Sequence, residues 1–284
     1  MRLAPGIPKQ SDYLRLLKNN IFIQIEQFSN DFLRINKKKL ENYHLIKDPL
    51  HQIFRQWEYP FCYSYIEEYL KHVGCDEKIK QRAVILDAGS GCTFFPYYLY
   101  RKFPNARVYC CDVDAYLASF FYDINIKMNM NIDFKVCNIQ NLDYKRNFFN
   151  VIYCISVLEH TSNYKQIIGE FKRILKPNGL LIITFDISLD GKKNISINLA
   201  QDLLKELSNQ FGIIGVHDLK ELDLLKKIHE PNILTTRFGG RLNKKLLPWK
   251  LNWKQVIYEI IRLKIPKRPF WDLTVFCGAW RNEV

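Results

Sequence analysis

Two short segments carry residues whose types and spacing could hold a nucleotide-like ligand. The apolar run at residues 84–86 leads into Asp87, Gly89 and Gly91. Glycines there let the backbone approach a ligand closely, because no Cβ stands in the way, and parallel α/β sheets bind ligands at the carboxyl ends of their strands. Asp112 ends the next apolar run, 23 residues after Gly89, where a carboxylate can accept hydrogen bonds from both hydroxyls of a ribose.

The glycine segment also has a simpler interpretation, a tight turn between a strand and a helix. The third glycine of the dinucleotide fingerprint is absent, since Phe94 stands in its place. A pyrophosphate would then be less well accommodated, which weakens an interpretation as an NAD site.

The elements that must position these residues follow from the spacing of apolar side chains. Apolar residues three or four apart predict helices at 14–32 and 66–74, and the three lysines at 37–39 predict a solvated loop or a helix end. From residue 83 onward, strands alternate with helices. Because the strands are apolar on both faces, they predict a mainly parallel sheet covered by helices. The predicted strands lie at 83–86, 107–111, 133–137, 151–155, 180–185 and 273–280, and the helices at 94–103, 115–127, 164–175 and 200–211.

Five segments in this order resemble the motifs of class I S-adenosylmethionine-dependent methyltransferases, and most of all the small-molecule group that includes the ubiquinone-biosynthesis enzymes. They are DAGSG at 87–91, Asp112, VCNI at 136–139, SVLEH at 156–160 and LKPNG at 175–179. The resemblance covers about residues 80–190. It implies an α/β, Rossmann-like fold with a mainly parallel seven-stranded sheet and helices on both faces. Residues 1–80 would form a helical annex and cofactor lid, and 81–284 the methyltransferase domain, with an acceptor-site insertion at about 187–270.

The resemblance implies S-adenosylmethionine as the cofactor and assigns residues to it. Gly89 and Gly91, with Ser90 between them, would lie against its methionine and ribose parts. Asp87 would support that loop and the cofactor amino group. Asp112 would bind the ribose hydroxyls.

Four further residues would complete the cofactor site. Val113 would lie against the adenine face, Asn138 would meet the adenine amino group with Ile139 packed beside it, and Ser156 would line the site after the fourth strand. Related enzymes usually have Asp where this chain has Asn138. The amide oxygen of Asn138 can still accept a hydrogen bond from that amino group.

The segment at 54–60 is dense in aromatic and charged residues and precedes a predicted helix. In related enzymes such a segment folds over the cofactor. Arg55 could then pair with the methionine carboxylate, and Trp57 or Tyr59 could face the cationic sulfonium. The alternative is a helix entry whose aromatic side chains pack on the core.

His160 is the histidine of the motif region and the candidate catalytic base. Methyl transfer to an oxygen or nitrogen that carries a proton can use a base to take that proton, and a histidine titrates in the suitable range. His160 could instead brace the start of a helix, with catalysis coming from the alignment of donor and acceptor.

Charge gives a second indication about partners. The 284-residue chain has a formal net charge of +13, and residues 241–268 hold nine Lys and Arg against one acid, Glu259. An anionic or lipid-linked acceptor, a lipid surface or nucleic acid could bind there. The amphipathic stretch at 251–268 predicts either a helix docked over the acceptor pocket or an interfacial helix. Nucleic acid is disfavoured, because the motif that amino-group DNA methyltransferases carry after the fourth strand is absent.

The remaining composition points to a cytoplasmic protein, with peripheral membrane contact as the alternative. The eight cysteines show no CxxC pair or metal-ligand spacing, which favours reduced, buried thiols without a metal. No signal peptide and no apolar run of membrane-spanning length is apparent.

The sequence thus predicts methyl transfer to a small-molecule or glycan-type acceptor, most simply at oxygen. C-methylation of a quinone or prenyl acceptor, N-methylation of an amine, and a non-catalytic cofactor-binding scaffold with a basic surface are the alternatives. The sequence does not predict an oligomeric state.

Overall fold

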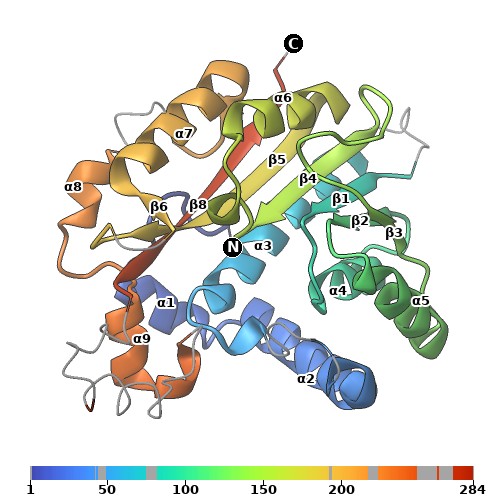
Figure 1. The fold of residues 1–284 in the computed structure, drawn as a ribbon, viewed down its shortest axis with the longest axis horizontal. Coiled ribbons are helices and arrows are strands. Elements are labelled where there is room, and N and C mark those ends of the chain that lie inside the picture. The colour runs from blue at the N-terminus through green and yellow to red at the C-terminus, as the bar shows by residue number, and fades with distance from the viewer. Residues whose placement is uncertain are drawn as a thin grey trace.

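An eight-stranded sheet runs through the middle of the molecule, with helices on both faces (Figure 1). The computed structural model describes residues 2–41, 43, 49–74, 82–191, 194–216, 223–247, 261 and 271–283. Its strands are β1 (Val84–Ala88), β2 (Arg107–Asp112), β3 (Asp133–Val136), β4 (Phe149–Ile155), β5 (Leu175–Ser188), β6 (Ile195–Ser196), β7 (Gly212–Ile213) and β8 (Leu273–Arg281).

The sheet is mainly parallel, as predicted. Its strand order is β3-β2-β1-β4-β5-β8-β7, and the two-residue β6 pairs with the end of β5, which makes one strand more than the predicted seven. Strands β1 to β5 pair in parallel, and β8 lies antiparallel between β5 and β7. The order reverses at β1, which has β2 on one side and β4 on the other. Such a switch point is where open α/β sheets bind ligands.

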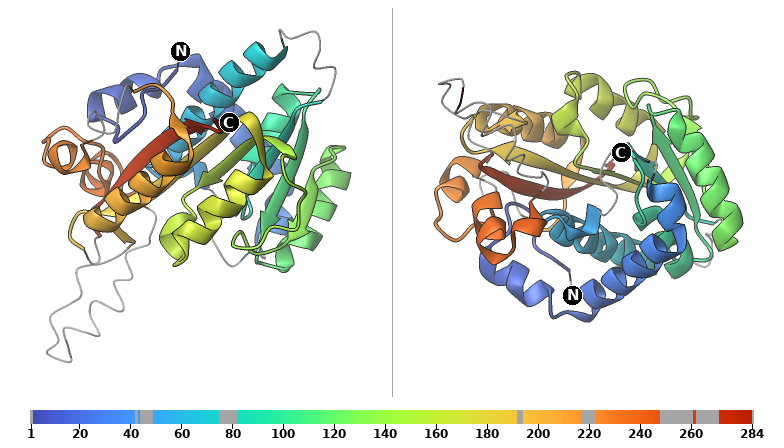
Figure 2. Two further views of the ribbon diagram at one scale, coloured as in Figure 1. Left: turned by 90° about the horizontal axis from the view of Figure 1, so that it is seen from above. Right: turned by 60° about the horizontal axis from the view of Figure 1, so that its bottom comes forward.

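Two layers of helices bury the two faces of the sheet (Figure 2). The helices on one face include α3 (Arg55–Gly74), α4 (Phe95–Lys102) and α5 (Tyr116–Met128), with α1 (Gln10–Leu16) and α2 (Asn20–Glu41) outside them. The opposite face carries α6 (Tyr164–Ile174), α7 (Ile197–Gln210) and α8 (Leu224–Ile228). The other described elements are α9 (Thr236–Leu242) and the short 3-10 turns η1 (Pro49–His51), η2 (Leu158–His160) and η4 (Lys244–Leu246).

The N-terminal annex differs from the prediction in its helix boundaries. The apolar seam at 14–32 is divided between α1 and α2, which are separated by residues 17–19. The lysines at 37–39 lie within α2 and close to its end, because cationic side chains suit the C-terminal end of a helix. The annex shares one hydrophobic core with the sheet, so it is packed on the main domain.

Helix α3 begins earlier than predicted. It was expected to start after the aromatic segment at 54–60, yet it starts at Arg55 and contains Pro60. Pro60 is the sixth residue of α3, beyond its first turn, so α3 lacks the backbone hydrogen bond that an N–H at this position would donate to the Gln56 carbonyl. Because α3 begins at Arg55, Arg55 and Glu58 both lie in its first turn.

Most of the described cysteine side chains are buried, as the sequence predicts. The free cysteines are Cys62, Cys92, Cys110, Cys111, Cys137, Cys154 and Cys277, and all but the half-buried Cys137 are buried.

Residues 248–270, apart from Ile261, are not described, so the predicted amphipathic helix at 251–268 lies outside the described residues and stays a prediction. Among the described helices, none combines the length and apolar character needed to cross a membrane.

Candidate functional site

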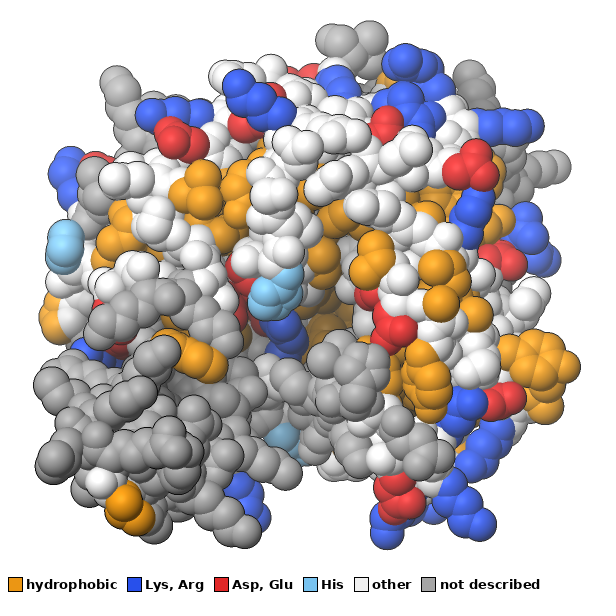
Figure 3. Space-filling model, viewed as in Figure 1, with side chains coloured by type: hydrophobic (Ala, Val, Ile, Leu, Met, Phe, Trp, Pro, Cys, Tyr) orange, Lys and Arg blue, Asp and Glu red, His pale blue; other side chains and the backbone are white. Residues whose placement is uncertain are grey.

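A cavity of about 830 Å³ opens at the carboxyl ends of β1, β2 and β4, within the size range of small-molecule sites. Figure 3 shows that acidic, basic and histidine side chains meet at a hollow in the middle of this face. With the exception of Trp57, the residues that the sequence singled out as binding or catalytic line the cavity: Arg55, Tyr59, Asp87, Gly89, Ser90, Gly91, Asp112, Val113, Asn138, Ile139, Ser156 and His160. Their individual roles remain predictions.

The glycine loop has a backbone shape that requires glycine. Gly89 and Gly91 have φ angles of 80° and 52°, in the left-handed region that disfavours other residues. A Cβ on Gly89 would also lie 2.6 Å from Cγ2 of Val157. The loop is anchored to β2, because the backbone N–H groups of Gly89 and Ser90 donate to the Cys111 carbonyl over 2.9 and 3.0 Å.

Asp112 is held in place by two backbone donors. Its Oδ2 accepts from the Gly91 N–H at 2.9 Å, and its Oδ1 accepts from the Asp114 N–H at 3.0 Å. Each carboxylate oxygen can accept a further hydrogen bond. The carboxylate is therefore oriented in advance and retains acceptor capacity for a pair of ligand hydroxyls.

The adenine side of the predicted site joins β2 to the residues after β3. The Cys137 N–H donates to the Asp112 carbonyl at 2.9 Å. Asn138 Oδ1, the predicted acceptor for the adenine amino group, already accepts from the Gln140 N–H at 2.9 Å. Only its second lone pair is then available for a ligand. Of the two predicted apolar contacts, Val113 is 67% exposed and Ile139 is buried.

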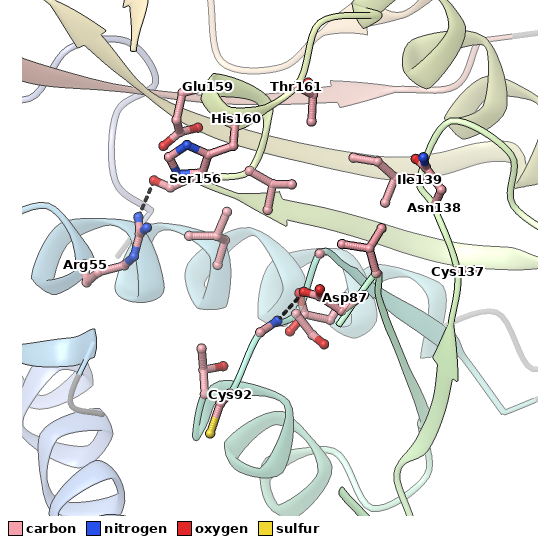
Figure 4. A pocket seen from close by; sticks show the side chains of 18 of the residues that line it. Arg55, Asp87, Cys92, Cys137, Asn138, Ile139, Ser156, Glu159, His160 and Thr161 are labelled. Carbon is pink, nitrogen blue, oxygen red and sulfur yellow. Dashed lines mark hydrogen bonds between the residues drawn. The ribbon is translucent and has the colours of Figure 1, made fainter. Parts of the chain in front are cut away.

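Arg55 lies at the cavity with its guanidinium already paired. Its Nη1 donates to Glu58 and to the Ser156 hydroxyl, and Figure 4 shows the second of these contacts. Burial lowers the pKa of Arg55, but the nearby acids, Glu58 foremost, outweigh this effect and hold the pKa above its ordinary value. Any carboxylate of a ligand would have to share the guanidinium with Glu58. This competition between Glu58 and a ligand carboxylate was not predicted from the sequence.

Glu58 links α3 to the ends of β4 and β5. Its side chain is fully buried, and its Oε1 accepts from the Ser156 hydroxyl at 2.7 Å and from the Thr184 hydroxyl. Ser156 adopts a φ of 48°, unusual for a serine, and its N–H donates to the Thr184 carbonyl at 3.0 Å. Backbone strain of this kind persists only where surrounding contacts enforce it.

Glu159 is the main feature of the site to which the sequence assigned no role. It lies in η2 and lines the cavity beside His160. Burial raises the pKa of Glu159 well above its ordinary value, the charge of Asp186 raises it further, and Arg55 opposes the shift. The SVLEH motif contains Glu159, but sequence spacing cannot show that Asp186, at the end of β5, is close to it.

The two aromatic candidates for a sulfonium contact separate in the structure. Tyr59 lines the cavity. Trp57 is buried in the hydrophobic core and does not line the cavity, so Trp57 follows the alternative prediction, that of packing on the core.

Asp87 is buried, and this desolvation raises the pKa of its carboxyl well above the usual range.

Comparisons with known proteins bear on the family of this chain. Residues 86–183 match the methyltransferase domain family. An uncharacterized protein of Methanocaldococcus jannaschii is 28% identical over 154 residues, 48% of this chain and 63% of that protein. The tRNA U34 carboxymethyltransferase of Campylobacter curvus is 22% identical over 54% of this chain and 51% of that enzyme. The chain thus spans between half and two thirds of the length of these two curated relatives.

A solved structure shows the same fold. The geranyl diphosphate C-methyltransferase of Streptomyces coelicolor, crystallised with S-adenosyl-L-homocysteine, aligns with 77% of this chain and 82% of its own at a TM-score of 0.50 and 14% identity.

Proposed function

Because residues 86–183 form a methyltransferase domain of the class I, S-adenosylmethionine-dependent type, we propose that this chain transfers a methyl group from S-adenosylmethionine to a small-molecule acceptor. The observation that carries the proposal is the cavity at the switch point of the sheet. Motif residues from four separate segments of the chain line that cavity together, although up to 73 residues separate them in sequence, from Asp87 to His160.

The residues present suit the cofactor. Asp112 would bind the ribose hydroxyls, since its carboxylate is fixed and retains acceptor capacity. Gly89 and Gly91 would admit the ribose and methionine parts, because neither has a Cβ on the loop. Asn138 and Ile139 would take the adenine, and Ser156 the methionine end. When bound, S-adenosylmethionine supplies an activated methyl group on a cationic sulfur.

For the acceptor we propose an oxygen or nitrogen atom that must lose a proton. His160 is exposed and lines the same cavity as the cofactor loop, which supports it as the base. Oxygen is the simplest acceptor. Replacement of His160 by Gln should then lower turnover while leaving cofactor affinity unchanged, whereas full turnover would remove the base role.

Calorimetric titration with S-adenosylmethionine and S-adenosylhomocysteine tests the cofactor proposal. Wild-type protein should bind both. Asp112→Ala should weaken binding by at least about tenfold, because charge-assisted hydrogen bonds contribute roughly 1.5–3 kcal/mol each. The matched control is Asp202→Ala, at an exposed position of α7 outside the cavity, which should bind like the wild type. Absence of binding by the wild type would refute the proposal.

A further inference from the structure

We infer that the acceptor carries a protonated amine, which Glu159 binds in the part of the cavity opposite the nucleoside, with Asp186 behind it. This rests on the proposed function and names the substrate class for the same site. The ammonium serves for recognition, and the atom that receives the methyl group depends on which acceptor atom lies before the sulfonium.

The first observation is an oxygen of Glu159 without a partner. Glu159 lines the cavity, and its Oε2 is buried without a hydrogen-bond partner among the described residues. A buried acceptor without a hydrogen-bond partner lowers the stability of the folded protein by roughly 1–3 kcal/mol, and by more when it is charged. A ligand that donates a hydrogen bond from a cation would satisfy both the oxygen and the charge.

The second observation is the balance of charge around Glu159. The one guanidinium lining the described part of the cavity, that of Arg55, is paired with Glu58, whose Oε1 is already used by Ser156 and Thr184. Glu159 and Asp186 are close enough to raise the pKa of Glu159. An ammonium beside Glu159 would offset the repulsion between the Glu159 carboxylate and the Asp186 charge.

The third observation is where these groups lie relative to the cofactor loop. Figure 4 shows Asn138 and Ile139 on one side of the cavity, Glu159, His160 and Arg55 on the other, and Asp87 between them. The nucleoside part of the cofactor would occupy the side of Asn138 and Asp112. The methionine end would lie by Ser156 and Arg55, and the acceptor would approach beside Glu159 and His160. The acids there do not suit an anionic acceptor.

Matched probes test the inference in protein saturated with S-adenosylhomocysteine and in the presence of a metal chelator. Glucosamine is compared with glucose, and tyramine with 4-(2-hydroxyethyl)phenol, so that each pair differs at the amine. Calorimetry should detect at least one amine binding at least about tenfold more tightly than its neutral counterpart. Glu159→Gln should remove that preference and leave the affinity for S-adenosylhomocysteine unchanged. Asp202→Asn, the exposed control, should retain the preference.

The outcomes separate this inference from the proposed function. Equal binding of amines and their neutral counterparts, or no binding of either amine, overturns the inference even where the cofactor binds normally. A loss of S-adenosylmethionine affinity in Glu159→Gln without a change in amine binding also overturns it, because the acid would then serve the cofactor's own ammonium. Failure of the wild type to bind the cofactor refutes the proposed function itself.

Discussion

Glu159 and Glu170 are two carboxyls whose surroundings shift their pKa values in opposite directions. Burial raises the pKa of Glu159 above 4.5, with Asp186 on β5 adding to the shift and Arg55 on α3 opposing it. The Arg173 guanidinium lowers the pKa of Glu170 by a side-chain hydrogen bond. The first residue is expected to cost stability at neutral pH and the second to contribute it. Retaining a costly acid is typical of functional sites.

The sign of the pH dependence follows from proton binding. Between the unfolded pKa of Glu159 and its higher folded value, the folded protein binds more protons, so this residue lowers stability as the pH rises. Glu159→Gln should therefore increase the free energy of unfolding at about pH 8 and have little effect at about pH 4. Glu170→Gln should decrease the free energy at about pH 8, because a depressed pKa stabilises the protein above the unfolded value.

Urea unfolding of the wild type and both variants at the two pH values measures these differences. A loss of stability in Glu159→Gln at about pH 8 would show that the carboxylate is satisfied in the folded protein, and would remove the first support for an amine site.

At the scale of elements, the loop after β1 combines a left-handed backbone with a close contact. Replacing Gly89 by Ala should lower the free energy of unfolding by about 1–3 kcal/mol, because residue 89 has a φ of 80° and the new Cβ would approach Val157. It should also weaken the binding of S-adenosylhomocysteine. Urea unfolding and calorimetry measure the two effects.

Gly169 in α6 provides the matched control. A Cβ there meets nothing within 4 Å, and alanine favours a helix over glycine by up to about 1 kcal/mol. Gly169→Ala should be neutral or stabilising with unchanged cofactor affinity. A Gly89→Ala variant that behaved in the same way would show that the loop tolerates a side chain.

The first turn of α3 joins the annex to the sheet through the pair of Arg55 and Glu58. Arg55→Met should destabilise the protein by about 3 kcal/mol, because it leaves a fully buried carboxylate without its ion-pair partner. Adding Glu58→Gln should restore much of that stability. Urea unfolding measures both steps.

The double variant also isolates the predicted contact between Arg55 and the methionine carboxylate. Calorimetry should still show weakened S-adenosylmethionine binding after stability has recovered. Wild-type affinity in the double variant would instead assign Arg55 a purely structural role.

At the scale of the whole molecule, the annex and the sheet share one core. Phe28 and Phe32 of α2 lie with ring centroids 5.4 and 5.2 Å from Tyr98 and Tyr97 of α4, and α4 in turn packs on the sheet. We therefore expect one cooperative unfolding transition, with circular dichroism and tryptophan fluorescence changing together.

Phe32→Ala should lower the free energy of that transition by about 3–5 kcal/mol without dividing it in two. Ile35→Ala, at a position of the same helix that is 37% exposed, should change it by about 1 kcal/mol or less. A separate early transition for α2 in Phe32→Ala would show that the annex folds independently of the sheet.

The sequence by itself determined the order of strands and helices from β1 to β5, the carboxyl edge at which the cavity opens, and many of the residues that line it. These depend on local patterns: apolar runs, glycines at strand ends, and an acid after the second strand. Predictions from these local patterns are accurate because a parallel sheet brings the carboxyl ends of its strands to one edge. The boundaries within the annex were less accurate, since the apolar seam at 14–32 is continuous across the break between α1 and α2.

Only the tertiary structure decided which polar groups meet inside the cavity. Glu58 contacts Ser156 and Thr184 across 98 and 126 residues of sequence, and Glu159 in η2 lies near Asp186 in β5. Such pairings depend on how α3 crosses the ends of β4 and β5, which no local pattern encodes. The charge environment of the acceptor side follows from those pairings. The net charge of the chain indicated an anionic partner, whereas the described lining of the cavity favours a cationic one.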